Sequence, residues 1–411
     1  MTDHEGQTEE TEDIEEKALE EKAPQHSTSQ SITGVGTSLL RSLLVPALAL
    51  LTALVIGAII IALSDVQALP LLFSEPGQAL SSMGHEISIA YQALFRGSVG
   101  SVYAISETLF ATTPLALAGL GIALGFRAGL FNIGAQGQML IGGMAALWVG
   151  LYVSAPAFIH IPLALLAGLL GGMVWGGIAG LLKARTGAHE VITTIMFNFI
   201  ASFLVQWLLT VPLFQEPGRN NPQSAAIADS ATLPHLFGSG YRVTIGILIA
   251  VAAAFFLYWL LERSSVGFEL RAVGATQEAG RYAGMSVPLL ITLAMALAGG
   301  FAGMAGANQL MGLAPHKVTP ALAGSIGFDA ITVALLGRSH PIGVMWAALL
   351  FGALAAGGRE MQGAAQIPLD LVVVLQALIV VLVAAPALVR AIFRIKAGPE
   401  RTTEVTSGWG S

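Results

Sequence analysis

The 411-residue chain contains no cysteine and very little charge. The absence of cysteine excludes disulfides, thiolate metal sites and a cysteine nucleophile. Only 11% of the residues are charged and 55% are hydrophobic, whereas an average soluble domain is roughly 25% charged. A soluble fold of this length could not cover its surface with so few charges. The composition therefore excludes a water-soluble enzyme and a protein that binds a nucleic-acid polymer, and it indicates an integral membrane protein.

The few charges are unevenly distributed along the chain. Residues 1–31 hold ten of the 25 acidic residues and only two bases, with no apolar periodicity. We predict an acidic, disordered cytoplasmic tail over residues 1–35, a transmembrane domain over 36–395 and a cytoplasmic C-terminal tail over 396–411. No basic segment precedes a cleavage site, so we expect the first apolar run to be a retained anchor.

Apolar runs long enough to cross a bilayer core of about 30 Å recur along the chain. The eighth run is only about a dozen residues long, too short for an ordinary crossing. We expect it to be a half-helix, which is tolerated where protein or a water-filled cavity covers its broken backbone. The fold class is therefore an all-α integral membrane protein with about ten transmembrane helices, one of them short. The predicted spans are 43–63, 104–126, 131–153, 161–182, 191–213, 243–261, 289–311, 326–337, 341–358 and 369–391.

The basic residues predict the orientation of these spans. Ten spans place both termini on one side of the membrane, and cytoplasmic termini leave fourteen of the 19 lysines and arginines inside. This asymmetry is the one expected of a membrane protein, whereas nine spans would send the basic C-terminus outside. The outer basic residues are then Arg96, Arg219, Arg242, Lys317 and Arg359.

A weak internal echo indicates a repeat. Residues 115–119 of the second span resemble 297–300 of the seventh, and a polar, glycine-containing break follows each, over 131–138 and 324–329. Five spans per half make the two halves inverted, a plan common in transporters. We predict an inverted 5+5 repeat. The alternative is that two helices rich in glycine and alanine resemble each other by composition.

Polar residues in and beside the breaks are the candidates for a translocation path. Ionisable groups inside lipid are costly and usually functional, and Asp329 in the half-helix is the best candidate for a carboxylate at mid-depth; its alternative role is to cap that helix. Amides at a break either satisfy freed backbone groups or line a polar route. A neutral, hydrogen-bonding route suits an uncharged polar solute better than an ion. The predicted path residues are Asn132, Gln136, Gln138, Asn308, Gln309, Phe328 and Asp329.

The longest internal cytoplasmic loop, residues 262–285, contains a predicted short helix. Thr276 stands at its N-cap position and Gly284 closes it. An acidic residue in the first turn and a basic one in the last match the helix dipole. A charged helix on this face suits docking into another protein; a helix lying on the membrane surface is the alternative. The residues expected to couple the chain to a partner are Thr276, Gln277, Glu278, Arg281 and Tyr282.

Three stretches resemble a known family. The run 267–275 followed by 281–285 resembles the coupling loop of bacterial ABC importer permeases of the branched-chain amino acid, ribose and nucleoside superfamily. The runs 126–138 and 327–338 are similar to two motifs of its nucleoside-uptake branch, of the guanosine or purine type. The resemblance covers the chain from about residue 40 to 395.

Two motif sites, which together hold three residues, depart from the pattern of this family. Gln136 stands where relatives commonly carry Glu, and Thr276-Gln277 stands where Asn-Pro is common. The first difference affects the expected solute preference and the second the expected fit to an ATPase.

The resemblance implies a permease subunit with the ABC importer fold, located in the bacterial cell membrane. It also implies three partners: a nucleotide-hydrolysing ABC ATPase subunit, a second homologous permease and an extracytoplasmic solute-binding protein or lipoprotein. A phosphate-binding P-loop needs Lys after Gly, and no lysine of this chain follows a glycine. We therefore expect ATP and Mg²⁺ on the partner ATPase, with no cofactor, metal or catalytic residue on this chain. The external loop 214–242 is long enough to meet the binding protein; a plain connector is the alternative.

The expected function is translocation of a nucleoside or a related polar solute. A sugar or branched-chain amino acid permease of the same superfamily is the first alternative. An ion-coupled secondary carrier is the second, with Asp329 as its carboxylate. A channel is a third, and an intramembrane enzyme is disfavoured because no nucleophile, base and metal ligands cluster at depth.

Overall fold

The computed structural model describes residues 33–64, 68–365 and 369–394. The predictions of an acidic N-terminal tail and of a C-terminal tail concern residues that lie almost wholly outside these ranges. The chain divides into two compact units, Met1–Leu48 and Ala49–Ser411. The described part of the first unit is helical, and all the packing reported below lies within the second unit.

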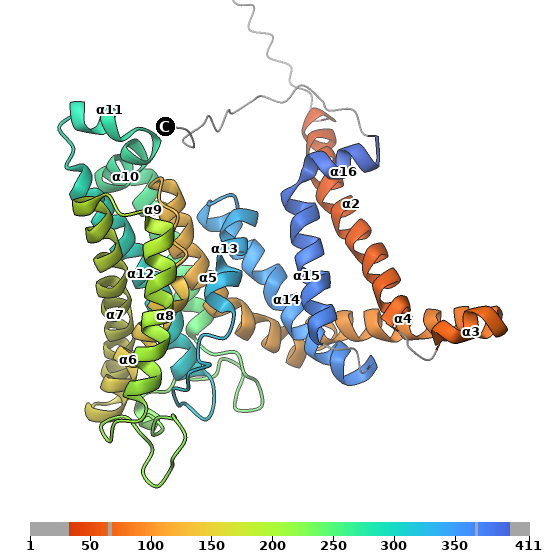
Figure 1. Ribbon diagram of the computed structural model, residues 1–411, viewed down its shortest axis with the longest axis horizontal. Coiled ribbons are helices and arrows are strands. Elements are labelled where there is room, and N and C mark those ends of the chain that lie inside the picture. Colours follow the sequence, from red (N-terminus) through yellow and green to blue (C-terminus); the bar gives the residue numbers. More distant parts are fainter. Residues whose placement is uncertain (1–32, 65–67, 366–368, 395–411) are drawn as a thin grey trace, which may run out of the picture. The chain divides into compact units, whose positions relative to one another are not determined.

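Helices make up nearly all the regular structure of the described residues, apart from two isolated β-bridges. Figure 1 shows their succession. They are α2 (Thr33–Ser64), α3 (Ala68–Ser74), α4 (Pro76–Val99), α5 (Val102–Arg127), α6 (Ala135–Tyr152), α7 (Ala157–Thr186), α8 (Glu190–Leu208), the 3-10 turn η1 (Asp229–Ala231), α9 (Gly246–Arg263), α10 (Ser265–Ala275), α11 (Gln277–Tyr282), α12 (Val287–Gly312), α13 (Ile326–Leu336), α14 (Pro341–Ala365), α15 (Leu369–Ala384) and α16 (Pro386–Ile392).

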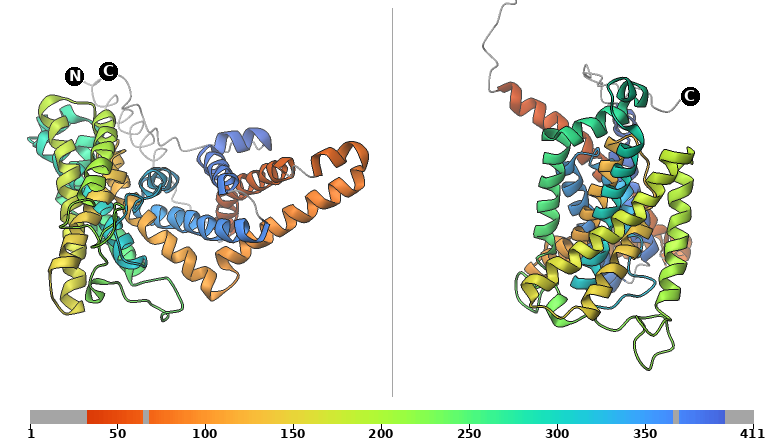
Figure 2. Two further views of the ribbon diagram at one scale, coloured as in Figure 1. Left: turned by 60° about the horizontal axis from the view of Figure 1, so that its bottom comes forward. Right: turned by 90° about the vertical axis from the view of Figure 1, so that its left-hand side faces the viewer.

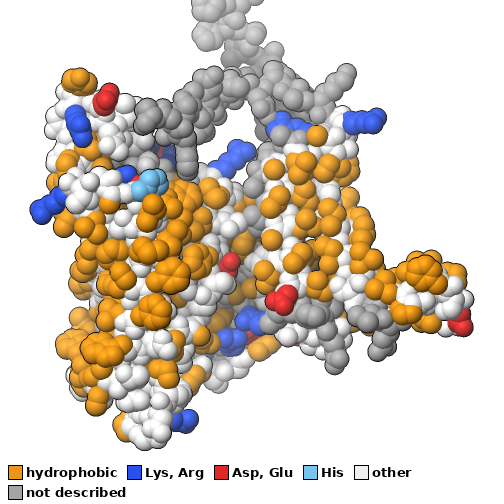
Figure 3. Space-filling model, in the orientation of Figure 1, with side chains coloured by type: hydrophobic (Ala, Val, Ile, Leu, Met, Phe, Trp, Pro, Cys, Tyr) orange, Lys and Arg blue, Asp and Glu red, His pale blue; other side chains and the backbone are white. Residues whose placement is uncertain are grey.

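Several helices are suited to cross a membrane. In the described ranges six are long and apolar enough, namely α5, α7, α8, α9, α12 and α14, or seven if residues 48–64 and α3 form one bent span. α13 is a shorter apolar helix, as the sequence predicted for a half-helix. Hydrophobic side chains cover much of the helical surface in Figure 3, with Lys and Arg gathered mainly towards its ends. The all-helical, multi-span class is confirmed, while the count of ten spans stays a prediction.

Two segments differ from the expectation. The connection between the first two predicted spans holds α3 and α4, and α4 buries only a narrow stripe of Ala79, Met83, Ala90 and Ala93. A search for continuous apolar runs misses such an amphipathic helix. The last predicted span is divided at Ala385 into α15 and α16, because the following proline has no N–H to continue the hydrogen bonds of the helix.

Glycines bring α7 and α12 into backbone contact. A Cβ on Gly172 would lie 2.1 Å from the carbonyl oxygen of Gly299, and a Cβ on Gly303 would lie 2.2 Å from that of Gly168. Small residues permit this approach in lipid, where the hydrophobic effect does not drive helices together. The glycine stripe of the fourth predicted span therefore faces the seventh.

The two halves of the chain use the same helix pairings. α12 packs on α6 and α7, and α5 packs on α13 and α14. Likewise, α6 packs on α7 and α8, as α13 packs on α14 and α15. Exchanging α5 with α12, α6 with α13, α7 with α14 and α8 with α15 maps one set of pairs onto the other. An internal repeat predicts such an exchange.

Two connections lie at opposite ends of the long helices. Figures 1 and 2 show α10 and α11 beyond one end of α7, α9 and α12, and the connection 209–245 beyond the other end. The loop predicted to be cytoplasmic and the loop predicted to be external are thus on opposite sides. Between the two connections, α5 and α12 are buried along most of their length.

Candidate functional site: two broken segments beside a cavity

The first break, residues 128–134, is closed by hydrogen bonds between its own side chains. The Asn132 amide donates to Gln138 Oε1 at 3.0 Å, and the Gln138 amide donates back to Asn132 Oδ1 at 3.2 Å. Asn132 Oδ1 also accepts from the Gly134 N–H at 2.9 Å. Both side chains are buried, with 1% exposed. The sequence left two roles open for these amides, namely to satisfy polar groups inside the protein or to line a polar route. Asn132 and Gln138 have the first role.

α8 supports the same break through a side chain that the sequence analysis missed. The Asn198 amide donates to the Ile133 carbonyl at 2.9 Å, and its Oδ1 accepts from the Gly137 N–H at 2.8 Å. Thr194 Oγ1 accepts from the Ile133 N–H at 3.3 Å. A lone asparagine within an apolar span was the available signal, because a polar side chain in lipid needs a partner.

The second break, residues 313–325, leads into the half-helix α13. Ser325 is the N-cap residue of α13, so the expectation that Asp329 caps this helix is wrong. Asp329 lies one turn further on, where its Oδ2 accepts a hydrogen bond from the Ser325 hydroxyl at 2.7 Å. A carboxylate in the first turn suits the positive end of the helix dipole.

Gln136, in the first turn of α6 directly after the first break, binds the end of the second break and the start of α13. Its Nε2 donates to the Gly324 carbonyl at 2.6 Å, and its Oε1 accepts from the Gly327 N–H at 3.0 Å. A Cβ on Gly327 would lie 2.5 Å from the Gln136 Cα, so the two backbones touch. The sequence predicted both breaks, and only the structure reveals that they meet.

A cavity of about 300 Å³ lies beside the second break. Among the predicted path residues, Gln309 and Asp329 line it. Three further polar residues line it that the prediction did not include, Ser325, Arg359 and Gln376. The rest of its wall is mainly apolar and comes from α5, α13, α14 and α15: Phe110, Ala111, Pro114, Leu115, Ile326, Ala355, Gly358, Val372 and Val373.

A buried carboxylate adjoins this cavity. Glu107 is 8% exposed, and its Oε2 accepts from Arg242 at 2.7 Å and from Arg359 at 3.2 Å. The Arg242 guanidinium also lies 4.3 Å from the ring centroid of Phe110. Glu107 shares a face of α5 with Phe110 and Pro114, three and seven residues on. Glu107, Asp329 and the two arginines bring two charges of each sign, so the surroundings of the cavity are formally neutral.

Two other predicted path residues lie away from the cavity. Asn308 is buried, and within the described ranges its Nδ2 has no hydrogen-bond partner. This amide packs on the start of α9, where a Cβ on Gly246 would lie 2.0 Å from Nδ2. Phe328 is 49% exposed and does not line the cavity.

The predicted cytoplasmic helix is present as α11. Thr276 is its N-cap residue, and Gly284 follows with a φ of +80°, a conformation that glycine adopts without strain. The five predicted coupling residues are all exposed, and Tyr282 is 93% exposed. A second helix, α10, precedes it and was not predicted; the Ser264 hydroxyl accepts from the Gly267 N–H at its start.

The end of α10 touches the first break. A Cβ on Gly129 would lie 2.6 Å from the Gly274 carbonyl oxygen, and the φ of Gly129 is +68°. A side chain at either glycine would push the two segments apart. The contact therefore joins α10, in the loop predicted to be cytoplasmic, directly to the first break.

Arg127 adds a polar link at the same place. Its Nε donates to the Ser339 carbonyl in the turn between α13 and α14 at 3.1 Å. Its Nη1 lies 3.8 Å from Glu262, which also pairs with Arg271 at 2.7 Å. The end of α5 is thus bound both to the segment before α10 and to the end of the half-helix.

The connection 209–245, which we predict to be external, is attached to the second break. The Lys317 ammonium donates to Glu216 at 2.6 Å, and this bond lowers the pKa of the Glu216 carboxyl below its ordinary value. The Val318 N–H donates to Ser224 Oγ at 2.8 Å, and the Ser224 N–H donates to the Val318 carbonyl at 3.0 Å. These bonds hold the loop against the residues that lead into α13.

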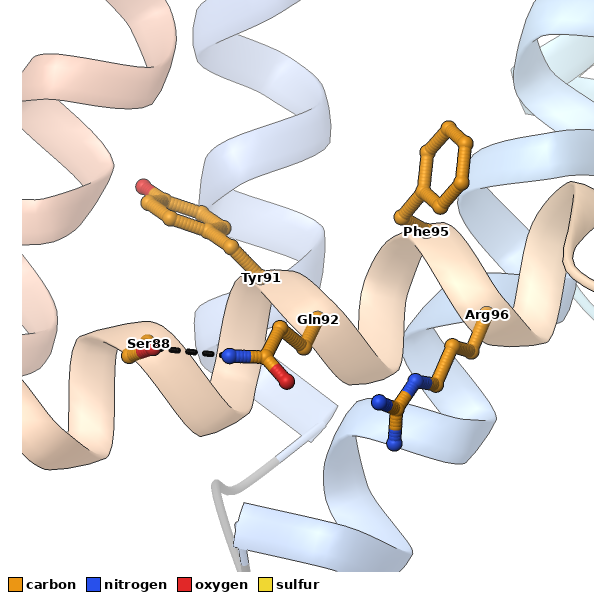
Figure 4. A pocket seen from close by; sticks show the side chains of 5 residues that line it. All are labelled: Ser88, Tyr91, Gln92, Phe95 and Arg96. Carbon is orange, nitrogen blue, oxygen red and sulfur yellow. Dashed lines mark hydrogen bonds between the residues drawn. The ribbon is translucent and has the colours of Figure 1, made fainter.

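A second hollow, of about 380 Å³, lies on α4. Figure 4 shows that its five lining side chains all come from this one helix. Gln92 donates to the Ser88 hydroxyl at 2.9 Å. Neither broken segment borders this hollow.

The chain belongs to the family described as the branched-chain amino acid transport system / permease component, whose model matches residues 104–384. It is 38% identical to the guanosine ABC transporter permease protein NupP of Bacillus subtilis, over 85% of this chain and 95% of that protein. It is 32% identical to the nucleoside ABC transporter permease protein NupB of Lactococcus lactis, over 90% of this chain and 98% of that protein. The glucose ABC transporter permease protein TsgB13 of Haloferax volcanii is 38% identical, over 74% of this chain and 82% of that protein. No solved structure matches significantly.

This membership confirms the resemblance inferred from three motifs, to the superfamily and to its nucleoside branch. The chain is a transport component, a multi-pass membrane permease. The residues that carried the resemblance lie in and around the first break, in α13 and the turn after it, and in α10 and α11.

Proposed function

We propose that this chain is the permease subunit of an ABC importer that translocates a nucleoside. Two of the relatives are named for guanosine and nucleoside transport and one for glucose, so the names alone leave two solute classes. The cavity beside α13 favours the nucleoside. Its walls are mainly apolar and include the ring of Phe110, which suits a flat nucleobase better than a fully hydroxylated sugar.

The polar groups of the cavity fit the rest of such a solute. Gln309 and Gln376 each offer an amide with donors and an acceptor, which matches the edge of a base or a ribose hydroxyl. The formal charges around the cavity are equal in number for the two signs, so no excess charge favours an ionic solute. The mainly apolar wall with the ring of Phe110 is the observation that carries the proposal.

The mechanism in this proposal is alternating access driven by a partner. An ABC ATPase docks at α11 and holds the ATP and Mg²⁺, and a second homologous permease completes the pair. An extracytoplasmic binding protein delivers the solute at the connection 209–245. ATP binding then favours one of two conformations of the broken segments, and hydrolysis favours the other. This chain carries out no covalent chemistry.

Uptake into proteoliposomes tests the proposal. The four components are reconstituted together, and labelled guanosine, uridine and glucose are compared with and without ATP. We expect ATP-dependent uptake of the nucleosides that unlabelled glucose does not inhibit. Uptake of glucose alone would assign the sugar instead. Uphill uptake by this chain alone, driven by an ion gradient and lost in Asp329→Asn, would replace the proposal with a secondary carrier.

A further inference from the structure

Gln136 binds the second broken segment at two points with one side chain. The amide nitrogen donates to the Gly324 carbonyl at 2.6 Å, and the amide oxygen accepts from the Gly327 N–H at 3.0 Å. The two partners lie on either side of the N-cap residue of α13. A relative rotation or slide of the two segments would break at least one of these bonds.

The backbones leave no room for the segments to move past each other. A Cβ on Gly327 would lie 2.5 Å from both the nitrogen and the Cα of Gln136. Packed backbones of this kind have few alternative arrangements, because a small shift creates a clash. The start of α6 and the start of α13 are thus held by contact as well as by hydrogen bonds.

Each broken segment is anchored on a different side of the protein. The first break touches the end of α10 through Gly129 and Gly274. The second break is bound to the external connection through the ion pair of Lys317 with Glu216. Gln136 is therefore a side-chain link in a continuous chain of contacts from the cytoplasmic helices to the external loop.

We propose that Gln136 is a positioning residue that makes the two broken segments move as one unit during transport. It does not line the cavity, so its effect on the solute is exerted through α13 and Asp329. This inference rests on the proposed transport function. It predicts that loss of the two-point bond lowers the turnover of the importer while the apparent affinity for the solute changes little.

The Gln136→Leu variant removes both bonds and keeps a side chain of similar size. We expect the maximal uptake rate of the reconstituted importer to fall about tenfold. The apparent affinity for the solute should change little, which separates a slowed movement from a lost solute contact.

Two further variants separate this effect from a general loss of function. Gln92→Leu makes the same exchange on α4, at an exposed amide bound only to Ser88 among the hydrogen bonds described. Its rate should match that of the parent. Gln136→Asn, one methylene too short to reach both partners, should be slow like Gln136→Leu.

The outcomes distinguish this inference from the proposed function. If the parent importer takes up no nucleoside, the proposed function fails, and stimulation of the partner ATPase by the binding protein then serves as the readout for the same variants. A parent-like rate of Gln136→Leu or of Gln136→Asn would overturn the inference. A change confined to the apparent affinity would also overturn it, because that result would assign Gln136 to solute contact. If Gln136→Leu is not monodisperse in detergent, Gln136→Asn replaces it in both comparisons.

Discussion

At the scale of single residues, the close packing of α7 on α12 depends on glycines, which have no side chain. Gly172 has no side chain where the carbonyl of Gly299 approaches to 2.1 Å from the place of a Cβ. Gly177 lies on the same helix, and the nearest atom to its would-be Cβ is 3.5 Å away. Both residues are glycines of α7, but only Gly172 is packed too closely to admit a side chain.

We predict that Gly172→Ala destabilises the protein by about 1–3 kcal/mol, because α7 and α12 must move apart to admit the methyl group. Gly177→Ala is the matched control, and it should be neutral or stabilise the helix by up to about 1 kcal/mol. Thermal unfolding of the purified variants in detergent measures both. Equal midpoints for the two variants would contradict the backbone contact.

The Asn198 side chain provides hydrogen bonds to backbone groups that other backbone groups provide in an unbroken helix. It binds a carbonyl and an N–H of the first break. We predict that Asn198→Ala costs about 1–3 kcal/mol, since two buried backbone groups lose their partner. Gln206→Ala, at an exposed position of the same helix, should change stability by less than about 0.5 kcal/mol. The same unfolding measurement compares them, and an unchanged midpoint for Asn198→Ala would mean that water replaces the amide.

At the scale of elements, the charged group around Glu107 ties three segments together. α5 supplies the carboxylate, the external connection supplies Arg242 and α14 supplies Arg359. Glu107 Oε1 is buried and, among the described residues, without a hydrogen-bond partner. Removing one arginine leaves the other in place, so the buried carboxylate stays paired while the external connection is released.

We predict that Arg242→Gln makes the cavity more accessible from outside. The chain has no cysteine, so Ala111→Cys places one thiol on the cavity wall. A membrane-impermeant thiol reagent should label this cysteine several-fold faster when Arg242 is exchanged. Arg219→Gln, whose side chain pairs with Glu216 at 3.6 Å instead, is the control and should leave the rate unchanged. Equal labelling rates in all three backgrounds would argue against a closing role.

The external connection carries a pH-dependent contact of its own. Lys317 lowers the folded-state pKa of Glu216, so the pair stabilises the docked loop above the ordinary pKa of a glutamate, near 4.3. This stabilisation is lost as the pH falls through the lowered folded-state pKa. Hydrogen exchange of residues 213–224 should therefore be slow at pH 7 and faster below about pH 4 once corrected for intrinsic rates. Glu216→Gln should show the faster exchange already at pH 7; slow exchange in that variant would assign the docking to the backbone bonds instead.

At the scale of the whole molecule, the exposed helix α11 and the buried breaks form one connected structure. The side chains of α11 are exposed, and Gly280 is its buried position. Their exchange should therefore leave the fold intact and act only on a partner. We expect Glu278→Ala and Arg281→Ala to change stability by less than about 0.5 kcal/mol.

The same two variants should reduce stimulation of the partner ATPase in the reconstituted importer, because α11 is the proposed docking element. Arg263→Ala, an exposed exchange at the end of α9, should retain it. The measurement is ATP hydrolysis with and without the loaded binding protein. Full stimulation in all three variants would place the docking surface elsewhere.

Much of the membrane architecture was accessible from the sequence alone. Apolar runs, basic-residue asymmetry and the polar breaks depend on neighbours within a few residues, and lipid requires each span to satisfy its own backbone. The short helix after Thr276 and the short α13 were predicted for this reason. The amphipathic α4 was missed because its apolar residues form a narrow stripe rather than a run.

The tertiary structure decided which of these local features meet. Glu107 binds arginines 135 and 252 positions away in the chain, and Gln136 binds a segment 188 to 191 positions away. No local period encodes such pairs, since they form only when packed helices bring their side chains together. The sequence by itself determined that the chain is a broken-helix membrane permease. The contact between its two breaks, and the cavity beside them, exist only in the folded molecule.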